Sequence, residues 1–224
     1  AAHAAAVLEQ AQAERIPSIL PLRDNTTVAF VDLAVHPAHR RRGIGNQLLA
    51  EAGRLAADAG RTELIAEVDE PTPDTAGRAF AQRHGWTCDL LETRRDLVLP
   101  FEEARLSALE GEARQASTGY QVVTWRDSTP DALLADRALL EIRMSTDAPH
   151  GDLPVEEERW DGERIREIER MNVARGRTVL SAGAVREGRL VAFTDLHVFL
   201  DRTEHARQGA TLVLREHRGH RLGA

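Results

Sequence analysis

The chain has 224 residues, a net charge of −7 and a hydrophobic content of 42%, the profile of a soluble globular protein with one large or two modest domains. The acidic balance argues against general nucleic-acid binding, and the lack of an apolar run of about 18 residues argues against a membrane span. A single cysteine, Cys88, rules out an intrachain disulfide, and the N-terminus lacks the layout of a signal peptide, so we expect a cytoplasmic protein.

Residues 1–99 predict a first unit in which helices and strands alternate. The central segment has a β-branched strand, an amphipathic helix and a second short strand, which together predict a βαβ unit with two parallel strands. The expected helices cover residues 1–16, 44–59 and 75–84, and the expected strands cover residues 19–22, 27–35, 62–68, 86–91 and 94–99.

Residues 100–119 predict an exposed linker helix rich in Glu, Ala and Arg, and residues 120–224 predict a second unit. Around the Glu187-Gly188 turn, two strand patterns predict a β-hairpin. The expected helices cover residues 131–144 and 156–172, and the expected strands cover residues 121–125, 177–185, 190–199 and 209–214. The whole chain is therefore expected to adopt an α+β fold, a mixed sheet with flanking helices.

A basic, glycine-bearing turn lies between the strand over residues 27–35 and the helix over residues 44–59. Glycines let the backbone approach a ligand closely, and the first N–H groups of a helix favour an anion. Arginines add forked hydrogen bonds to phosphate oxygens. The turn therefore predicts a phosphate-binding loop, although an ordinary turn with solvated arginines would share each of these features singly.

The spacing of the turn is Arg-x-x-Gly-x-Gly at Arg40, Gly43 and Gly45, which differs from the Walker A and Rossmann patterns. It resembles the acetyl-CoA pyrophosphate loop of the GNAT N-acetyltransferase superfamily. The resemblance implies acetyl-CoA as co-substrate, no metal, and transfer of an acetyl group to a primary amine of a small molecule or peptide. The cofactor-binding residues that it implies here are Leu33, Ala34, Val35, Arg40, Arg41, Arg42, Gly43, Ile44, Gly45 and Asn46.

A second motif near the end of the chain, residues 217–224, resembles residues 39–46. The two motifs share the His, the Arg, an aliphatic residue and a Gly near the end. His39 and His217 lie 178 positions apart, and each motif follows a strand pattern, so we predict a tandem duplication. The matching cofactor residues of the second copy are Arg218, Arg221 and Gly223. Arg221 replaces Gly43, which removes one close backbone approach.

Both copies are expected to be incomplete. The chain matches the C-terminal half of one GNAT-like domain and the N-terminal half of another. It is therefore expected to be a fragment or to lack internal segments, with complementation between the two halves as a third explanation.

The family's chemistry needs a base that removes a proton from the amine. Asp32, on the strand entering the loop, and Glu67, on the neighbouring strand, are the candidates, whereas the second copy has Ala210 at the position of Asp32. No residue is a convincing general acid, since the only tyrosine, Tyr120, lies in the second unit. The alternative is a degenerate CoA-binding or scaffold protein without catalysis. We expect no nucleic-acid or membrane partner, and a homodimer remains open.

Overall fold

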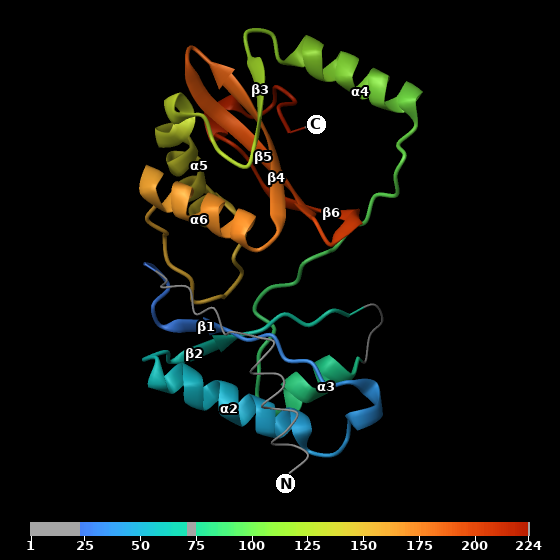
Figure 1. Ribbon diagram of the computed structural model, residues 1–224, viewed down its shortest axis with the longest axis vertical. Coiled ribbons are helices and arrows are strands. Elements are labelled where there is room, and N and C mark those ends of the chain that lie inside the picture. The colour runs from blue at the N-terminus through green and yellow to red at the C-terminus, as the bar shows by residue number, and fades with distance from the viewer. Residues whose placement is uncertain (1–22, 71–74, 224) are drawn as a thin grey trace. The chain divides into compact units, whose positions relative to one another are not determined.

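The structure, a computed structural model, describes residues 23–70 and 75–223, which form two compact units (Figure 1). The first unit comprises Ala1–Leu91 and His150–Glu156, and the second comprises Glu92–Pro149 and Glu157–Ala224, each over its described residues. The helix and strand predicted over residues 1–16 and 19–22 lie outside the described residues. Each unit combines a sheet with helices, so the predicted α+β class is confirmed.

The first unit contains the predicted βαβ element. Strand β1 (Val28–Phe30) leads to helix α2 (Ile44–Asp58), which is followed by strand β2 (Glu63–Ile65) and helix α3 (Ala76–Arg83). The two strands pair in parallel with Val28 opposite Glu63, as predicted. A β-branched strand pattern and a helical apolar stripe were therefore sufficient signals for this element.

The strands of the first unit are shorter and fewer than the sequence predicts. Both strands of the βαβ element are three residues long, and residues 86–91 and 94–99 form no strand. A strand needs a partner for its backbone groups, and among the described residues β1 and β2 pair only with each other. The apolar side chains of residues 91–99 are consequently exposed.

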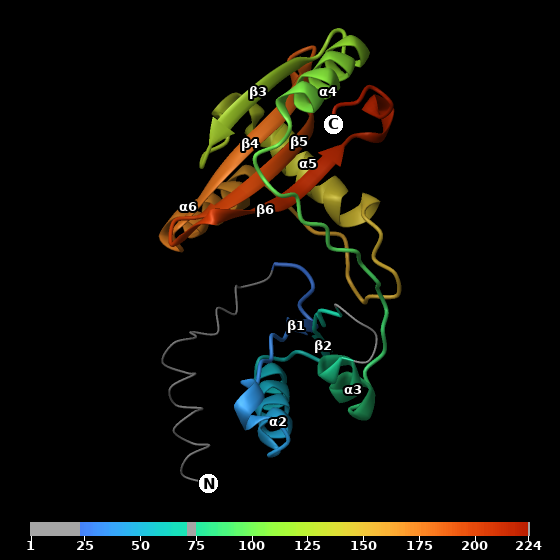
Figure 2. The same cartoon turned by 90° about the vertical axis from the view of Figure 1, so that its right-hand side faces the viewer.

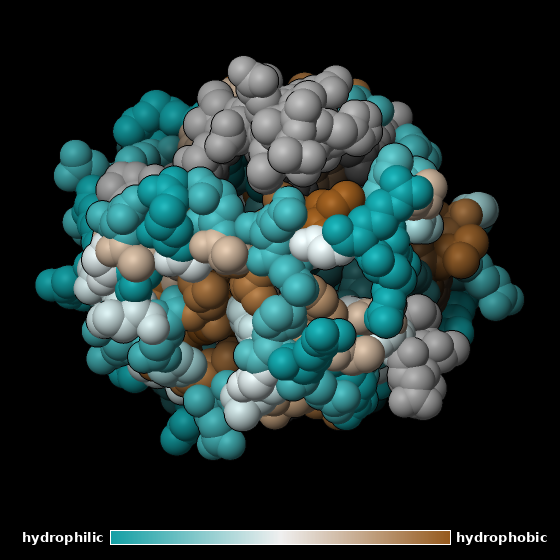
Figure 3. Space-filling model, turned by 90° about the horizontal axis from the view of Figure 1, so that it is seen from below, coloured by the Kyte–Doolittle hydropathy of each residue, from teal (hydrophilic) through white to brown (hydrophobic). Residues whose placement is uncertain are grey.

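The first unit also has a small core. Among its described apolar side chains, only Val28 and Ala56 are buried, whereas Phe30 is 66% exposed. Figure 3 shows hydrophobic patches, in brown, between the hydrophilic side chains of the molecule as seen from below. Apolar side chains at such exposure add little to the stability of the unit.

The second unit is built on an antiparallel sheet in the order β3-β4-β5-β6. Helices α5 and α6 contact each other and pack on this sheet, and α4, which forms within the segment predicted as a linker helix, belongs to the second unit (Figures 1 and 2). The elements are α4 (Glu103–Ala116), β3 (Gln121–Arg126), α5 (Leu134–Asp147), α6 (Gly162–Ala174), β4 (Arg177–Arg186), β5 (Arg189–Phe199) and β6 (Arg202–Val213). The predicted hairpin is confirmed, with Glu187 and Gly188 both in the left-handed region.

The core of the second unit combines apolar side chains with a buried charged cluster. Arg137 of α5 donates to Asp195 of β5 at 2.8 Å and to Glu141 at 2.5 Å, and Ser181 Oγ donates to Asp195 at 2.6 Å. The guanidinium of Arg137 lies 3.7 Å from the ring centroid of Phe193. Burial raises the pKa of the Glu141 carboxyl, although Arg137 opposes the shift. This cluster fixes α5 to the sheet.

The loop between α5 and α6 belongs in part to the first unit. The backbone N–H of Glu156 donates to Asn25 Oδ1 at 2.8 Å, and the N–H of Asn25 donates back to the Glu156 carboxylate. The N–H of Asp152 donates to the carbonyl of Asp89 at 3.1 Å. Residues 150–156 are therefore hydrogen-bonded to Asn25 and Asp89 of the same unit.

Candidate functional site

The candidate site is the loop that joins β1 to α2. A single 3₁₀ turn, Pro37–His39, follows the extended residues 31–36, and Arg40 Nε then donates to the carbonyl of Val35 at 3.0 Å. This bond spans the turn and fixes the start of the loop. Gly43 is the N-cap of α2 with φ +81°, a conformation that side-chain-bearing residues rarely adopt.

The loop presents positive charge and unpaired donors. The first N–H groups of α2, from Ile44 to Asn46, have no intrahelical acceptor by the geometry of a helix, and the first turn carries no acidic residue. Nothing lies within 4 Å of the position that a Cβ on Gly43 would occupy. Arg40, Arg41 and Arg42 are exposed, and within residues 23–70 and 75–223 none of them forms an ion pair. These features suit a phosphate group.

Two of the predicted cofactor residues also contact α3. A Cβ on Gly45 would lie 3.1 Å from Phe80 Cε2, so the absence of a side chain allows α2 and α3 to approach closely. Asn46 Oδ1 lies 3.1 Å from His84 Nε2, and His84 caps the C-terminus of α3. The missing side chain of Gly45 and the side chain of Asn46 therefore keep the loop close to α3. The backbone N–H groups of both residues remain available at the start of α2.

The residues before the loop lie outside any strand, and no strand of the described chain pairs with them. Leu33, Ala34 and Val35 follow the last β1–β2 hydrogen bond, from the N–H of Val31 to the carbonyl of Ile65 at 2.8 Å. The sheet ends there among the described residues. Their backbone donors can therefore serve a ligand, as the sequence prediction requires.

The two candidate bases lie just beyond the end of the β1–β2 ladder. Both carboxylates are exposed. Extension of the observed register would place Asp32 opposite Glu67, two residues beyond the last pair, Phe30 and Ile65. The sequence places both residues on neighbouring strands, whereas β1 ends at Phe30 and β2 at Ile65, so neither residue lies in a strand, and the structure does not bring the two side chains into a shared contact.

Among the described residues of the first unit, none has the setting of a general acid. Cys88 is exposed, and its Sγ donates to the carbonyl of Leu90 at 3.7 Å. Tyr120, in the second unit, has its hydroxyl 2.9 Å from His217 Nδ1 and accepts a hydrogen bond from Arg186 at 3.1 Å.

The second loop repeats the backbone of the first at an interval of 178 residues. The 3₁₀ turn Arg215–His217 matches Pro37–His39, and Arg218 Nε donates to the carbonyl of Val213 at 3.1 Å as Arg40 does to Val35. In the first loop Arg41 and Gly43 have φ of +62° and +81°, and at the matching positions of the second loop Gly219 and Arg221 have φ of +86° and +52°. The predicted internal repeat is thus confirmed in three dimensions.

The side chains of the second loop have partners that those of the first lack. Arg218 forms an ion pair with Asp147 at 2.6 Å, and Arg221 forms one with Glu112. A Cβ on Gly223 would lie 3.9 Å from Val213 Cγ2. The sequence offered no signal for these pairs, because the acids precede the arginines by 71 and 109 residues.

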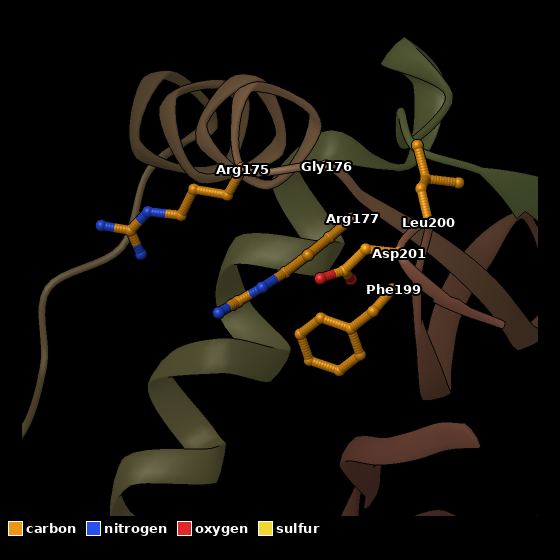
Figure 4. A pocket seen from close by; sticks show the side chains of 6 residues that line it. All are labelled: Arg175, Gly176, Arg177, Phe199, Leu200 and Asp201. Carbon is orange, nitrogen blue, oxygen red and sulfur yellow. The ribbon is translucent and has the colours of Figure 1, made fainter. Parts of the chain in front are cut away.

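A separate pocket of about 470 Å³ lies in the second unit, at the end of α6 and the β5–β6 turn (Figure 4). Arg177 extends over the ring of Phe199, with 5.1 Å from its guanidinium carbon to the ring centroid. The other lining residues are Arg175, Gly176, Leu200 and Asp201. The pocket contains none of the predicted site residues.

The described residues contain neither a metal-binding cluster nor a membrane-spanning helix. No three side chains among His, Cys, Asp and Glu come together in a way that could hold a metal ion. No helix there combines the length and apolar character that a membrane crossing requires.

Comparison with known proteins identifies the class. The model of the acetyltransferase (GNAT) domain matches residues 6–88, and the chain belongs to the GNAT acetyltransferases. It is of tandem type. Its 32%-identical structural relative is a tandem GNAT protein from the clavulanic acid biosynthesis pathway, solved without AcCoA, with a TM-score of 0.61. The match covers 89% of this chain and 60% of that one, so the chain spans less than two thirds of the relative's length. No curated protein matches the chain.

Proposed function

We propose that the protein is an acetyl-CoA-dependent N-acetyltransferase whose first loop holds the cofactor's diphosphate. The observation that carries the proposal is a loop with an open glycine, free helix N–H groups and three arginines, none of which forms an ion pair in the described part of the chain. A diphosphate would satisfy all three features at once. Membership of the GNAT family supports the same cofactor class.

Within this proposal, Arg40, Arg41 and Arg42 bind phosphate oxygens together with the backbone of residues 43–46. The extended residues 33–35 offer their N–H groups to the rest of the cofactor. Acetyl-CoA, when bound, would supply a thioester whose acyl carbon could be attacked by a neutral amine, with the carbon–sulfur bond breaking and CoA leaving as its thiolate. Asp32 or Glu67 takes the proton that the amine loses, since an exposed carboxylate beside the unpaired strand end can reach a bound ligand.

The acceptor is proposed to be a primary amine of a small molecule or peptide. The related tandem GNAT protein comes from the pathway of a small molecule, clavulanic acid, which favours a small-molecule acceptor. A CoA-binding protein without catalysis is the second candidate. It is favoured by the exposure of both carboxylates and by the location of the only tyrosine outside the first unit.

Calorimetric titration with acetyl-CoA, CoA and ATP tests the cofactor. Arg40→Ala should weaken CoA binding by about 1–3 kcal/mol, the loss of one or two charge-assisted hydrogen bonds. Arg54→Ala is the matched control, because it removes an exposed arginine from helix α2, which follows the loop, and it should leave binding unchanged. Absence of CoA binding to the wild-type protein would refute the proposal.

Thiol release over a panel of amines then separates enzyme from binder. Asp32→Asn and Glu67→Gln test the base, because each keeps the shape of its side chain and removes the proton acceptor. A large fall in turnover in one variant with unchanged CoA affinity identifies the base. Unchanged turnover in both rejects the assignment, and CoA binding without thiol release from any amine supports the second candidate.

A further inference from the structure

The second loop has the backbone of a phosphate loop but a different set of side-chain partners. Arg40 and Arg218 occupy matching positions, and the Nε of each donates to the carbonyl of the valine five residues earlier. The terminal nitrogens of Arg40 have no partner among the described residues, whereas Nη2 of Arg218 donates to Asp147 Oδ2 at 2.6 Å. Asp147 is 14% exposed, so its carboxylate lies against the protein beside the loop.

The next arginine of the second loop is occupied as well. Arg221 takes the position of Gly43 and bonds to Glu112 of the linker helix α4. His220 Nδ1 lies 3.3 Å from the carbonyl of Ala116, near the end of the same helix. Figures 1 and 2 both show the C-terminal loop beside α4. The loop is thus attached to α4 through two side chains.

The loop is also attached to the sheet. His217 Nδ1 lies 2.9 Å from the hydroxyl of Tyr120, and Arg186 of β4 donates to the same hydroxyl. Leu222 packs against the buried residues Ala184 and Val191. Side chains of the loop therefore face three neighbouring elements, while the first loop's side-chain bonds to other segments run through Asn46 alone in the described chain.

Charge counts follow from these contacts. The first loop carries three arginines and no paired acid, a local formal charge of +3. In the second loop two arginines face two carboxylates, so the local formal charge is zero. A diphosphate entering the second loop would meet Asp147 and Glu112 at the nitrogens it needs, and like charges repel at such distances.

We propose that the second loop does not bind acyl-CoA but is an internal anchor, in which Asp147 and Glu112 take the place of phosphate oxygens and hold the loop to α4 and α5. Given the proposed function, the protein then binds one acyl-CoA, at the first loop. Carboxylate and phosphate oxygens accept the same forked hydrogen bonds from arginine, which explains how the backbone was retained while the ligand changed.

Hydrogen exchange with and without saturating CoA reports each loop separately. We expect CoA to slow exchange in residues 40–47 and to leave residues 215–223 unchanged, with a stoichiometry of one. Arg40→Ala should weaken CoA binding by about 5-fold or more, whereas the matched variant Arg218→Ala should change it by less than about 2-fold. Slowed exchange in residues 215–223, a stoichiometry of two, or equal losses in the two variants would overturn the inference.

The anchor is tested without any cofactor. In the unliganded protein, Asp147→Asn and Glu112→Gln should speed exchange of residues 215–223, and the matched surface variant Glu110→Gln should not. If neither variant changes exchange there, the anchor is refuted. If CoA binds neither loop while the two variants behave as expected, the proposed function fails and the anchor stands.

Discussion

Asp195→Ala gives the sharpest test of what holds the second unit together. Asp195 is 5% exposed and accepts hydrogen bonds from Arg137 and Ser181. The substitution leaves the Arg137 guanidinium, itself only 10% exposed, with one remaining carboxylate, that of Glu141 at 2.5 Å. A buried charge that loses a partner is strongly destabilising.

The magnitude follows from these contacts. Breaking a buried ion pair costs about 3–5 kcal/mol, and because Glu141 still compensates part of the Arg137 charge, we expect about 3 kcal/mol. Ser181→Ala removes one hydrogen bond from the same carboxylate and should cost about 1 kcal/mol. The difference between the two variants therefore measures the charge on Asp195 rather than the loss of a single hydrogen bond.

Urea unfolding followed by tryptophan fluorescence measures both variants, because Trp125 packs against the core that contains Leu140 and Phe193. Arg114→Ala is the control: its ion pair with Glu110 is exposed, and it should cost less than about 1 kcal/mol. If Asp195→Ala costs no more than Ser181→Ala, the buried pair does not stabilise the unit and the reasoning is refuted.

Three further outcomes are expected. Burial raises the pKa of Glu141 above its ordinary value of 4.5, so the stability that the protonated carboxyl contributes is present below pH 4.5 and is lost as the pH rises through the folded-state pKa. Over that rise in pH, the free energy of unfolding should fall less for Glu141→Gln than for the wild type. Parallel curves of unfolding free energy against pH would contradict this. Gly43→Ala should destabilise by about 1–2 kcal/mol because φ is positive, whereas Gly53→Ala, in the middle of α2, should stabilise by about 0.5–1 kcal/mol in the same thermal melt; equal signs would refute the strain argument. Asn25→Ala should speed amide exchange at Glu156 by removing its acceptor, and unchanged exchange would show that the bond does not hold the 150–156 loop.

Local signals predicted the fold where local chemistry decides it. The parallel βαβ element, the Glu187-Gly188 hairpin and the repeated loop all follow from short patterns. The start of α6 was predicted at residue 156 and is observed at Gly162. Asp161 is its N-cap and accepts from the N–H of Arg164 at 2.7 Å, while the Glu156 carboxylate bonds to the first unit.

Long-range partners were the part that the sequence did not reveal. The strands predicted over residues 86–91 and 94–99 have suitable residues but no partner in the described chain. Likewise, nothing near Arg218 indicates that Asp147 will be its partner, since the two residues are 71 positions apart and meet only through tertiary packing. Residue type thus predicted which secondary structure or ion pair each segment is able to form. Tertiary contacts decided whether that structure or pair is present.

The two loops exchange glycine and arginine at their two left-handed positions without a change of path. Arg41 matches Gly219, and Gly43 matches Arg221. Both loops share the 3₁₀ turn and the hydrogen bond from arginine Nε to a valine carbonyl. These two features therefore suffice to fix the backbone path. After a gene duplication, one copy is therefore free to drift in charge while selection on folding keeps its shape. Backbone path and the first arginine of the motif are therefore alike in the two loops, whereas the ionic partners of the guanidinium groups differ.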